Sequence, residues 1–300
     1  MRGVTIILAA SGWGAANFAT ADGALTVSQQ QLLKPILNHP DIHAEIYFAN
    51  WHLNSHQKSS DYSVDQRRTH VLHVGNWLSR IVEIAASKNH FVLVIGGDHS
   101  IAMGTWSGLK NADKDFGLIW IDAHMDAHTY ETSISKNPHG MPVAALLGSG
   151  DSEFVKLAKN PPVLKPASLI QTGIRSYEEE EQEFLEQLGV DISYHYKRHS
   201  YNGFDSIAKS KERLLQIYPY YGVSFDIDGI DPAYCPGTGT PADGGLELND
   251  VIQSLKGILF DTSCIGLEIV EYNPVSDHEQ ITFESVKKII ASLDSVVTRY

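Results

Sequence analysis

The sequence contains few cysteines and no long apolar run. Only two of its 300 residues are cysteines, Cys235 and Cys264, and neither belongs to a C-x-x-C pair. We therefore expect no disulfide framework and a reducing, cytoplasmic location. No run is long enough to span a bilayer, so no membrane association is expected either. The stretch from Val4 to Ala10 faintly resembles a secretory leader, but its short length favours a first buried strand.

Positive charge is also scarce. The chain has 23 Lys and Arg residues against 36 Asp and Glu residues, which gives a formal net charge of −13. Proteins that bind nucleic acids present basic patches, so this balance argues against a nucleic-acid partner. An acidic surface also attracts cationic substrates, although solubility alone accounts for such a charge.

The hydrophobic content of 43% is enough to bury a sizeable core. The chain shows no internal repeat and no linker, so one α/β domain over residues 1–300 is the simplest interpretation. Short, continuous and partly β-branched runs predict buried strands at 4–10, 44–48, 91–95, 117–121, 168–172, 222–225 and 264–270. Helical patterns fall between them, at 29–36, 71–87, 100–109, 141–147, 178–188, 208–217 and 283–293.

Polar motifs follow three of these predicted strands. The motifs are Gly96-Gly97-Asp98-His99, Asp122-Ala123-His124-Met125-Asp126 and Asp226-Ile227-Asp228-Gly229. Alternate side chains of an extended chain share one face, and the carboxyl ends of parallel strands meet at one rim. We therefore expect six side chains to converge there: His99, Asp122, His124, Asp126, Asp226 and Asp228.

Such a cluster predicts a metal centre. Carboxylates and imidazoles carry a large desolvation penalty unless positive charge compensates them. Each motif alone is common as a turn or a helix cap, but all three together favour a metal site. Ligand sets rich in oxygen suit manganese or magnesium, and the two histidines favour manganese. Six ligands are too many for one ion that must also hold water, whereas two Mn²⁺ ions roughly 3.5–4 Å apart use all of them.

The motifs G-G-D-H-S, D-A-H-x-D and S-F-D-I-D-G-I-D-P resemble the three metal motifs of the ureohydrolases, the arginase and agmatinase family. The match runs in order from about Gly96 to Pro274. It implies a three-layer α/β/α sandwich with a mainly parallel central sheet. By this resemblance, Asp122 and Asp226 bridge the two ions. His99 and Asp126 complete one coordination sphere, and His124 and Asp228 complete the other.

The resemblance also implies the chemistry. In this family, hydroxide that bridges the two metals attacks the guanidino carbon of the substrate. Asp126 corresponds to the residue that handles the proton for the leaving amine. His139, in the pair His139-Gly140, corresponds to a proton shuttle. Glu271, after the last predicted strand, corresponds to the partner of the guanidinium. The implied catalytic residues are therefore Asp126, His139 and Glu271.

The loop after the second metal motif is most similar to that of arginases. Ser135 and Asn137 match residues that hold the substrate's α-carboxylate in those enzymes, and Glu178 falls where they keep an Asp for the α-amino group. Glu178 also begins a glutamate-rich helix, where acidic residues are favourable by themselves. His128 stands where arginases have Asn, in the substrate-binding region. The leading function is hydrolysis of L-arginine to L-ornithine and urea.

Other functions stay open. The substrate could be another small guanidino or formimino compound, as in an agmatinase, guanidinobutyrase or formimidoylglutamase. A deacetylase of related fold would use a single zinc ion, and an inactive homologue would not need the full set of ligands. The six ligands, together with His139 and Glu271, argue against both.

The family implies a homo-oligomer, either trimer or hexamer, but the Arg-Glu pair of trimeric animal enzymes is absent after Gly244-Gly245-Leu246. Six histidines fit no ligand spacing and are expected on the solvated surface: His39, His43, His52, His56, His70 and His73.

Overall fold

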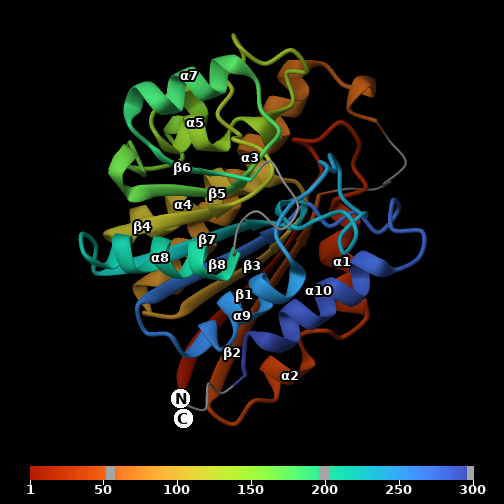
Figure 1. The fold of residues 1–300 in the computed structure, drawn as a ribbon, viewed down its shortest axis with the longest axis vertical. Coiled ribbons are helices and arrows are strands. Elements are labelled where there is room, and N and C mark those ends of the chain that lie inside the picture. The colour runs from red at the N-terminus through yellow and green to blue at the C-terminus, as the bar shows by residue number, and fades with distance from the viewer. Residues whose placement is uncertain (52–57, 196–202, 296–300) are drawn as a thin grey trace.

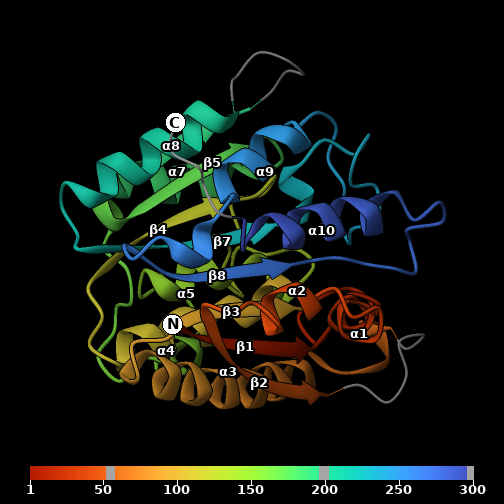
Figure 2. The same cartoon turned by 90° about the horizontal axis from the view of Figure 1, so that it is seen from below.

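A computed structural model describes residues 1–51, 58–195 and 203–295 of the chain. Their core is an eight-stranded sheet in which every neighbouring pair is parallel, in the order β2-β1-β3-β8-β7-β4-β5-β6. Figure 2 shows most of these strands side by side in this order. The strands are β1 (Arg2–Ala10), β2 (Ile42–Asn50), β3 (Phe91–Gly96), β4 (Phe116–Ile121), β5 (Leu169–Ile174), β6 (Asp191–Tyr194), β7 (Tyr220–Asp226) and β8 (Cys264–Val270).

Helices cover both faces of the sheet, which gives the predicted α/β/α arrangement (Figure 1). One layer contains α1 (Ala21–Gln29), α2 (Lys34–Leu37), α8 (Gly203–Leu215), α9 (Leu248–Leu255) and α10 (Ile281–Ser292). The other contains α3 (Val64–Ser87), α4 (Ala102–Asn111), α5 (Pro142–Leu146), α6 (Ser152–Val155) and α7 (Glu179–Leu188). Among the described residues, no helix is long and apolar enough to cross a membrane.

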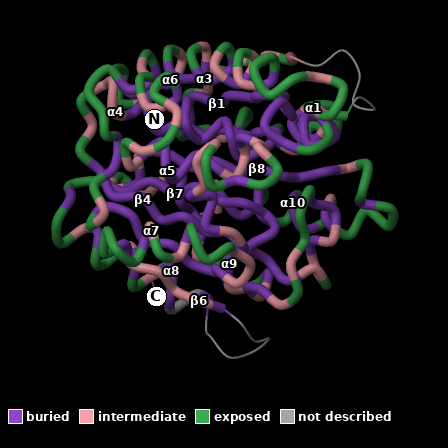
Figure 3. Tube along the Cα trace, turned by 90° about the horizontal axis from the view of Figure 1, so that it is seen from above, coloured by how far each residue is buried: buried purple, intermediate pink, exposed green. Residues whose placement is uncertain are grey.

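Two hydrophobic cores lie on opposite faces of the sheet, and alternate side chains of one strand belong to different cores. In β3, Phe91, Leu93 and Ile95 pack into the first core, whereas Val92 and Val94 pack into the second. A strand covered on both faces needs apolar residues at every position, which explains the unbroken apolar runs. Figure 3 shows the central strands buried, with the exposed residues on the outer turns of the helices.

All seven predicted strands are present, but some elements differ. β6 was missed because it is short and only half-buried along its length. The helix predicted over 29–36 was wrong. α1 ends at Gln29, Gln31 takes a left-handed φ of 56°, and α2 starts afresh at Lys34 with Pro35 in its first turn. α3 begins at Val64 instead of 71, because Ser63 and Gln66 form a reciprocal cap.

The histidine-rich segment is only partly on the surface. His43 and His73 are exposed, and His39 is half-buried. His70 is also half-buried and stacks on Trp13, with ring centroids 3.7 Å apart, and burial lowers its pKa. His52 and His56 lie outside the described residues.

The order of the strands determines where the site forms. β3, β8, β7 and β4 are consecutive in the sheet, and all run in the same direction. The three predicted metal motifs follow β3, β4 and β7, so they emerge from adjacent carboxyl ends. Strands distant in sequence thus deliver their polar residues to one place.

Candidate metal centre

The turn after β3 sets the position of His99. The side chain of Asp98 caps this turn by accepting the backbone N–H of Ser100 at 2.9 Å. Its other oxygen accepts the N–H of Gly14 at 2.9 Å. A Cβ atom at Gly14 would lie 2.2 Å from Asp98 Oδ1, so this close approach requires glycine. The first loop of the chain therefore supports the His99 turn.

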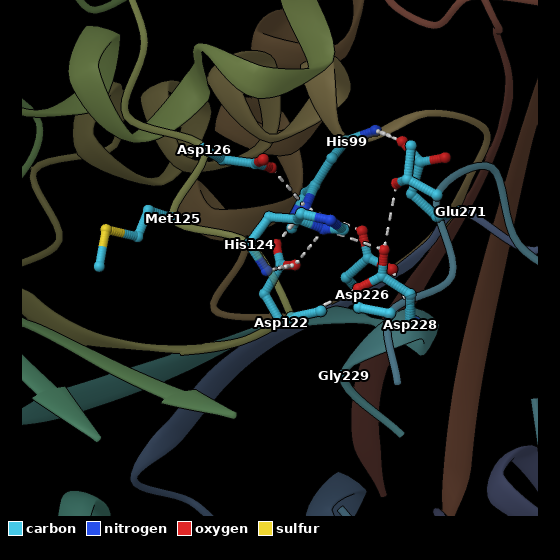
Figure 4. Close-up of polar contacts among 12 residues, drawn as sticks. His99, Asp122, His124, Met125, Asp126, Asp226, Asp228, Gly229 and Glu271 are labelled. Carbon is cyan, nitrogen blue, oxygen red and sulfur yellow. Dashed lines mark hydrogen bonds and ion pairs between the residues drawn. The ribbon is translucent and has the colours of Figure 1, made fainter. Parts of the chain in front are cut away.

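Three carboxylate oxygens surround the Nδ1 atom of His99 (Figure 4). Asp122 Oδ2 and Asp126 Oδ2 lie 3.1 Å away, and Asp226 Oδ2 lies 3.3 Å away. Within the described ranges, this buried nitrogen has no well-formed hydrogen bond. A single N–H cannot serve three acceptors, whereas one cation can be coordinated by His99, Asp122 and Asp226, whose ligand atoms all lie within 4.8 Å of one another. This group fits a metal ion.

A second group forms around His124. Its Nδ1 atom lies 3.4 Å from Asp122 Oδ1 and 3.2 Å from Asp228 Oδ2. Asp122 thus belongs to both groups, with Oδ2 toward His99 and Oδ1 toward His124. Asp226 points Oδ2 toward His99, while its Oδ1 accepts the N–H of Asp228 at 2.8 Å. The geometry places Asp122 between two candidate ion positions.

The protonation preferences of these groups reflect excess negative charge. Burial raises the pKa of Asp126 to about 6, and the neighbouring charge of Asp122 adds to the effect. Burial and the charges of Asp228 and Asp122 raise the pKa of Asp226 well above its usual range. Burial alone would lower the pKa of His99, but its three carboxylate neighbours raise it well above the usual value. Divalent cations would relieve this crowding.

A buried chain of hydrogen bonds holds the Nε2 atom of His99, on the side of the ring away from the three carboxylates. His99 Nε2 lies 2.9 Å from Ser224 Oγ, and Ser224 donates to Glu268 Oε1 at 2.8 Å. Ser224 and Glu268 are paired residues of β7 and β8. Thr105 also donates to Glu268, whose pKa is raised by burial. Metal-binding histidines commonly have such a partner on the second ring nitrogen.

These supporting hydrogen bonds were not predicted from the sequence. The residue that could have indicated them is Glu268, a single acidic residue inside the apolar run of β8. The strand order that pairs Glu268 with Ser224 could not be predicted from either residue alone.

Glu271 and His139 adjoin the first group of ligands. Glu271 follows β8 with a left-handed φ of 66° and is 1% exposed. Its Oε1 accepts the N–H of His99 at 2.8 Å and lies 3.1 Å from His139 Nδ1. Burial opposes charge on His139, but Glu271 and then Asp126 and Asp98 raise its pKa to about 9. His139 belongs to neither metal group in the described part of the chain.

The loop that follows Asp126 closes on itself. The N–H of His128 donates to the carbonyl of Gly140 at 3.0 Å. Within the loop, the hydroxyl of Ser135 accepts the N–H of Asn137 at 3.2 Å. Ser135 is exposed and Asn137 is half-buried. These two predicted substrate residues therefore lie close together on one hydrogen-bonded turn.

His128 contacts the start of α7 rather than the two metal groups. Its Nε2 atom lies 3.1 Å from Glu178 Oε2 and 3.4 Å from Glu181 Oε2. Glu181 was missed by the sequence analysis, because its position in a glutamate-rich helix start looked ordinary. Its oxygens accept the N–H groups of Ala127 and Glu178, and burial raises its pKa to about 8. The three side chains are close enough to share one cation.

Both the sequence and the structure of this chain are similar to those of arginases. Residues 31–294 match the model of the arginase family. An arginase from Bacillus subtilis (strain 168) is 36% identical over 219 residues, which cover 72% of this chain and 73% of that protein. The crystal structure of arginase from Bacillus subtilis superposes with a TM-score of 0.85 at 28% identity, covering 99% of this chain and 100% of that one. The crystal structure of Entamoeba histolytica arginase in complex with L-ornithine superposes with a TM-score of 0.86 at 27% identity, covering 99% of both chains.

Proposed function

The chain belongs to the arginase family of hydrolases, which act on linear amidines, and we propose that it cleaves L-arginine to L-ornithine and urea. The proposal extends the family assignment to one substrate. It is supported by four features of this chain, namely the two ligand groups, Glu271, His139 and the loop from His128 to Gly140.

The two ligand groups suit a pair of divalent ions. His99, Asp122 and Asp226 would hold one ion, with Asp126 beside His99, and Asp122, His124 and Asp228 would hold the other, so that Asp122 is shared. The donors are mainly carboxylate oxygens with one imidazole in each group, which favours manganese. When bound, two such ions lower the pKa of a shared water so that a strong nucleophile exists at neutral pH.

Glu271 is the observation that carries the proposal for a guanidino substrate. Its Oε2 atom is buried and makes no hydrogen bond within the described ranges, although Oε1 is fully engaged. A Cβ atom at Gly239 would come within 3.0 Å of Oε2, so glycine keeps the adjoining space open. A buried carboxylate oxygen without a partner is well placed to accept a hydrogen bond from a planar guanidinium.

His139 and Asp126 would move protons. His139 is held by Glu271 beside the place assigned to the guanidinium, and its raised pKa means that it carries a proton at neutral pH. It is therefore suited to deliver a proton toward the leaving amine. Asp126 lies on the opposite side of His99 from Glu271 in Figure 4 and would accept the proton of the attacking water.

The loop would hold the other end of the substrate. Ser135 and Asn137 would donate hydrogen bonds to the α-carboxylate of L-arginine, and Glu178 would accept one from the α-amino group. Glu178 is 59% exposed at its side chain, so its carboxylate can be approached from solvent. A linear substrate would thus run from Glu271 to the start of α7.

A second candidate follows from the position of His128. Its imidazole already contacts Glu178 and Glu181, the acids that would receive an α-amino group. This contact favours a guanidino acid that has a carboxylate but no α-amino group, such as 4-guanidinobutyrate. Agmatine, which has no carboxylate, would leave Ser135 and Asn137 without a ligand.

A panel of substrates tests both candidates. The manganese-loaded enzyme would be assayed for urea release from L-arginine, 4-guanidinobutyrate and agmatine, and for formamide release from formiminoglutamate. We expect the highest kcat/KM with L-arginine. A preference for 4-guanidinobutyrate would select the second candidate, and a preference for agmatine or formiminoglutamate would reject both. Light scattering in the same buffer would test the trimer or hexamer that we propose as the working assembly.

A further inference from the structure

Arg67, on α3, is a buried cation without an acidic partner. Its exposure is only 5%, and it is the only buried Lys or Arg among the residues that the structure describes. Burial lowers the pKa of its guanidinium. Within the described ranges no Asp or Glu oxygen lies within 4.0 Å of it, and its Nε atom makes no hydrogen bond. Charged side chains are rarely buried unless they are paired, so this charge calls for another explanation.

The guanidinium of Arg67 reaches the loop assigned to the substrate's carboxylate. Its Nη1 donates to Asn137 Oδ1 at 2.5 Å, and its Nη2 donates to the carbonyl of Lys136 at 3.3 Å. A guanidinium has donors only, so it can face only the oxygen of the Asn137 amide. The Nδ2 donor of that amide is therefore turned away from Arg67. Since the backbone N–H of Asn137 is held by Ser135, the Nδ2 group is the donor that stays available to a ligand.

A second cation in the same loop makes no ion pair within 4.0 Å among the residues that the structure describes. Lys136 has a left-handed φ of 55°, and its Nζ donates to the carbonyl of Tyr130. By contrast Arg68, the next residue of α3 after Arg67, forms a two-point ion pair with Asp151. The chain carries a net charge of −13, so acids are plentiful. Nevertheless, within the described ranges Arg67 makes no ion pair beside the loop that contains Ser135 and Asn137, and Lys136 of that loop makes none within 4.0 Å.

We propose that Arg67 is a positioning residue that makes the enzyme select substrates with a carboxylate group. It orients the Asn137 amide so that an N–H donor faces the substrate, and it places a buried positive charge behind that donor. A hydrogen bond to a charged acceptor is stronger where water is excluded. A positive charge behind the N–H donor also attracts the negatively charged carboxylate that accepts the bond. This inference rests on the proposed function of the site, but not on the choice between L-arginine and 4-guanidinobutyrate, because both carry a carboxylate.

The test compares substrates with and without a carboxylate in the manganese-loaded full chain. Arg67→Met removes the charge and the two donors while keeping a long side chain. We expect the KM values for L-arginine and 4-guanidinobutyrate to rise about tenfold or more, with kcat and the kcat/KM for agmatine little changed. Arg67→Lys keeps the charge but cannot hold Asn137 and Lys136 together, so an increase of roughly threefold is expected.

A matched control and a measurement independent of turnover complete the design. Arg68→Met removes a neighbouring cation of α3 that pairs with Asp151 instead of Asn137, and it should leave all three KM values unchanged. L-Ornithine and putrescine differ by a carboxylate, so their inhibition constants report on the same contact. Arg67→Met should weaken inhibition by L-ornithine about tenfold and leave inhibition by putrescine unaltered.

The outcomes separate this inference from the proposed function. Suppose that Arg67→Met loses kcat/KM equally with agmatine and L-arginine, while its manganese content and melting temperature stay normal. That result would overturn the role of Arg67 but not the proposed function. If Arg67→Met does not fold, an unchanged preference for carboxylate substrates in Arg67→Lys would overturn it. A wild type that prefers 4-guanidinobutyrate, with the expected Arg67 effects, would overturn only the L-arginine assignment. A wild type that prefers agmatine would overturn both.

Discussion

The imidazole of His128 lies against Glu178, with 3.1 Å between Nε2 and Oε2. The same nitrogen is 3.4 Å from Glu181, whose pKa is raised to about 8 mainly by burial. The α-amino group of a substrate would therefore compete with the imidazole of His128 for Glu178. We propose that His128, where arginases have Asn, weakens recognition of the substrate's α-amino group, while the candidate metal ligands and Glu271 are all present.

Replacing His128 tests this competition. In His128→Asn the two glutamates are released from the imidazole and become available to an ammonium group. We expect the kcat/KM ratio of L-arginine to 4-guanidinobutyrate to rise roughly tenfold, the worth of one hydrogen bond between charged groups. Both substrates carry a carboxylate, so the ratio isolates the α-amino group. His73→Asn, at an exposed histidine, should leave the ratio unchanged, and an unchanged ratio in His128→Asn would contradict the competition.

The shared position of Asp122 leads to a prediction about metal content. Asp122 contacts both imidazoles through different oxygens, whereas His99 belongs to one group only. Asp122→Ala should therefore lose both ions, and His99→Ala should retain one. Atomic spectroscopy after gel filtration measures the metal per chain, with Asp261→Asn as a control carboxylate on a distant loop. Equal metal loss in Asp122→Ala and His99→Ala would show that Asp122 is not shared.

Sequence patterns predicted the parts of the molecule that depend on local spacing. The continuous apolar runs of β3, β4 and β7 indicated buried strands, and the alternate spacing of Asp122, His124 and Asp126 indicated side chains on one face. Both statements need only the geometry of an extended chain. The six candidate ligand positions could be named because each of the three motifs follows its own strand, and parallel strands end at a common rim.

Relationships between distant elements could not be predicted in this way. Arg67 precedes the first metal motif by a whole helix, and only the packing of α3 brings it to Asn137. The pairing of Ser224 with Glu268 depends on β7 lying beside β8, and no local pattern encodes that order. Likewise, the contact between His128 and Glu178 exists because β4 and β5 are neighbours in the sheet.

His139 should be needed for turnover but not for metal binding. Its Nδ1 is 3.1 Å from Glu271, and it belongs to neither ligand group in the described ranges. His139→Ala should keep both ions and lose about 10²–10⁴-fold in kcat, the usual contribution of a proton-transfer group. Added imidazole should restore part of the rate, because it can enter the space left by the side chain. Loss of manganese from this variant would instead make His139 a metal ligand.

The raised pKa values at the site predict how stability depends on pH. Burial and neighbouring charge raise the pKa of Asp126 to about 6, and burial raises that of Glu181 to about 8, both above the ordinary carboxyl range. Neighbouring carboxylates outweigh burial and raise the pKa values of His99 and His124. The metal-free folded chain therefore holds protons that the unfolded chain releases. Its stability should be highest near about pH 5 and fall as the pH rises toward about 8.

Manganese should change this dependence, because each ion replaces the protons held by its ligands. The melting temperature of the chelated chain should fall between about pH 5 and 8, while the increase caused by saturating Mn²⁺ should grow over the same range. Asp122 and Glu178, whose pKa values are lowered by neighbouring groups against the effect of burial, act in the opposite sense at acidic pH. His70, His90 and His195, whose pKa values are lowered by burial, oppose the fall near neutral pH, so the comparison with and without Mn²⁺ isolates the site. Differential scanning fluorimetry with chelator or Mn²⁺ provides the measurement. In Asp126→Asn the increase in melting temperature caused by Mn²⁺ should grow less with pH, because one titrating ligand is gone. A manganese effect equal at both ends of the range would mean that these carboxylates do not exchange protons for metal.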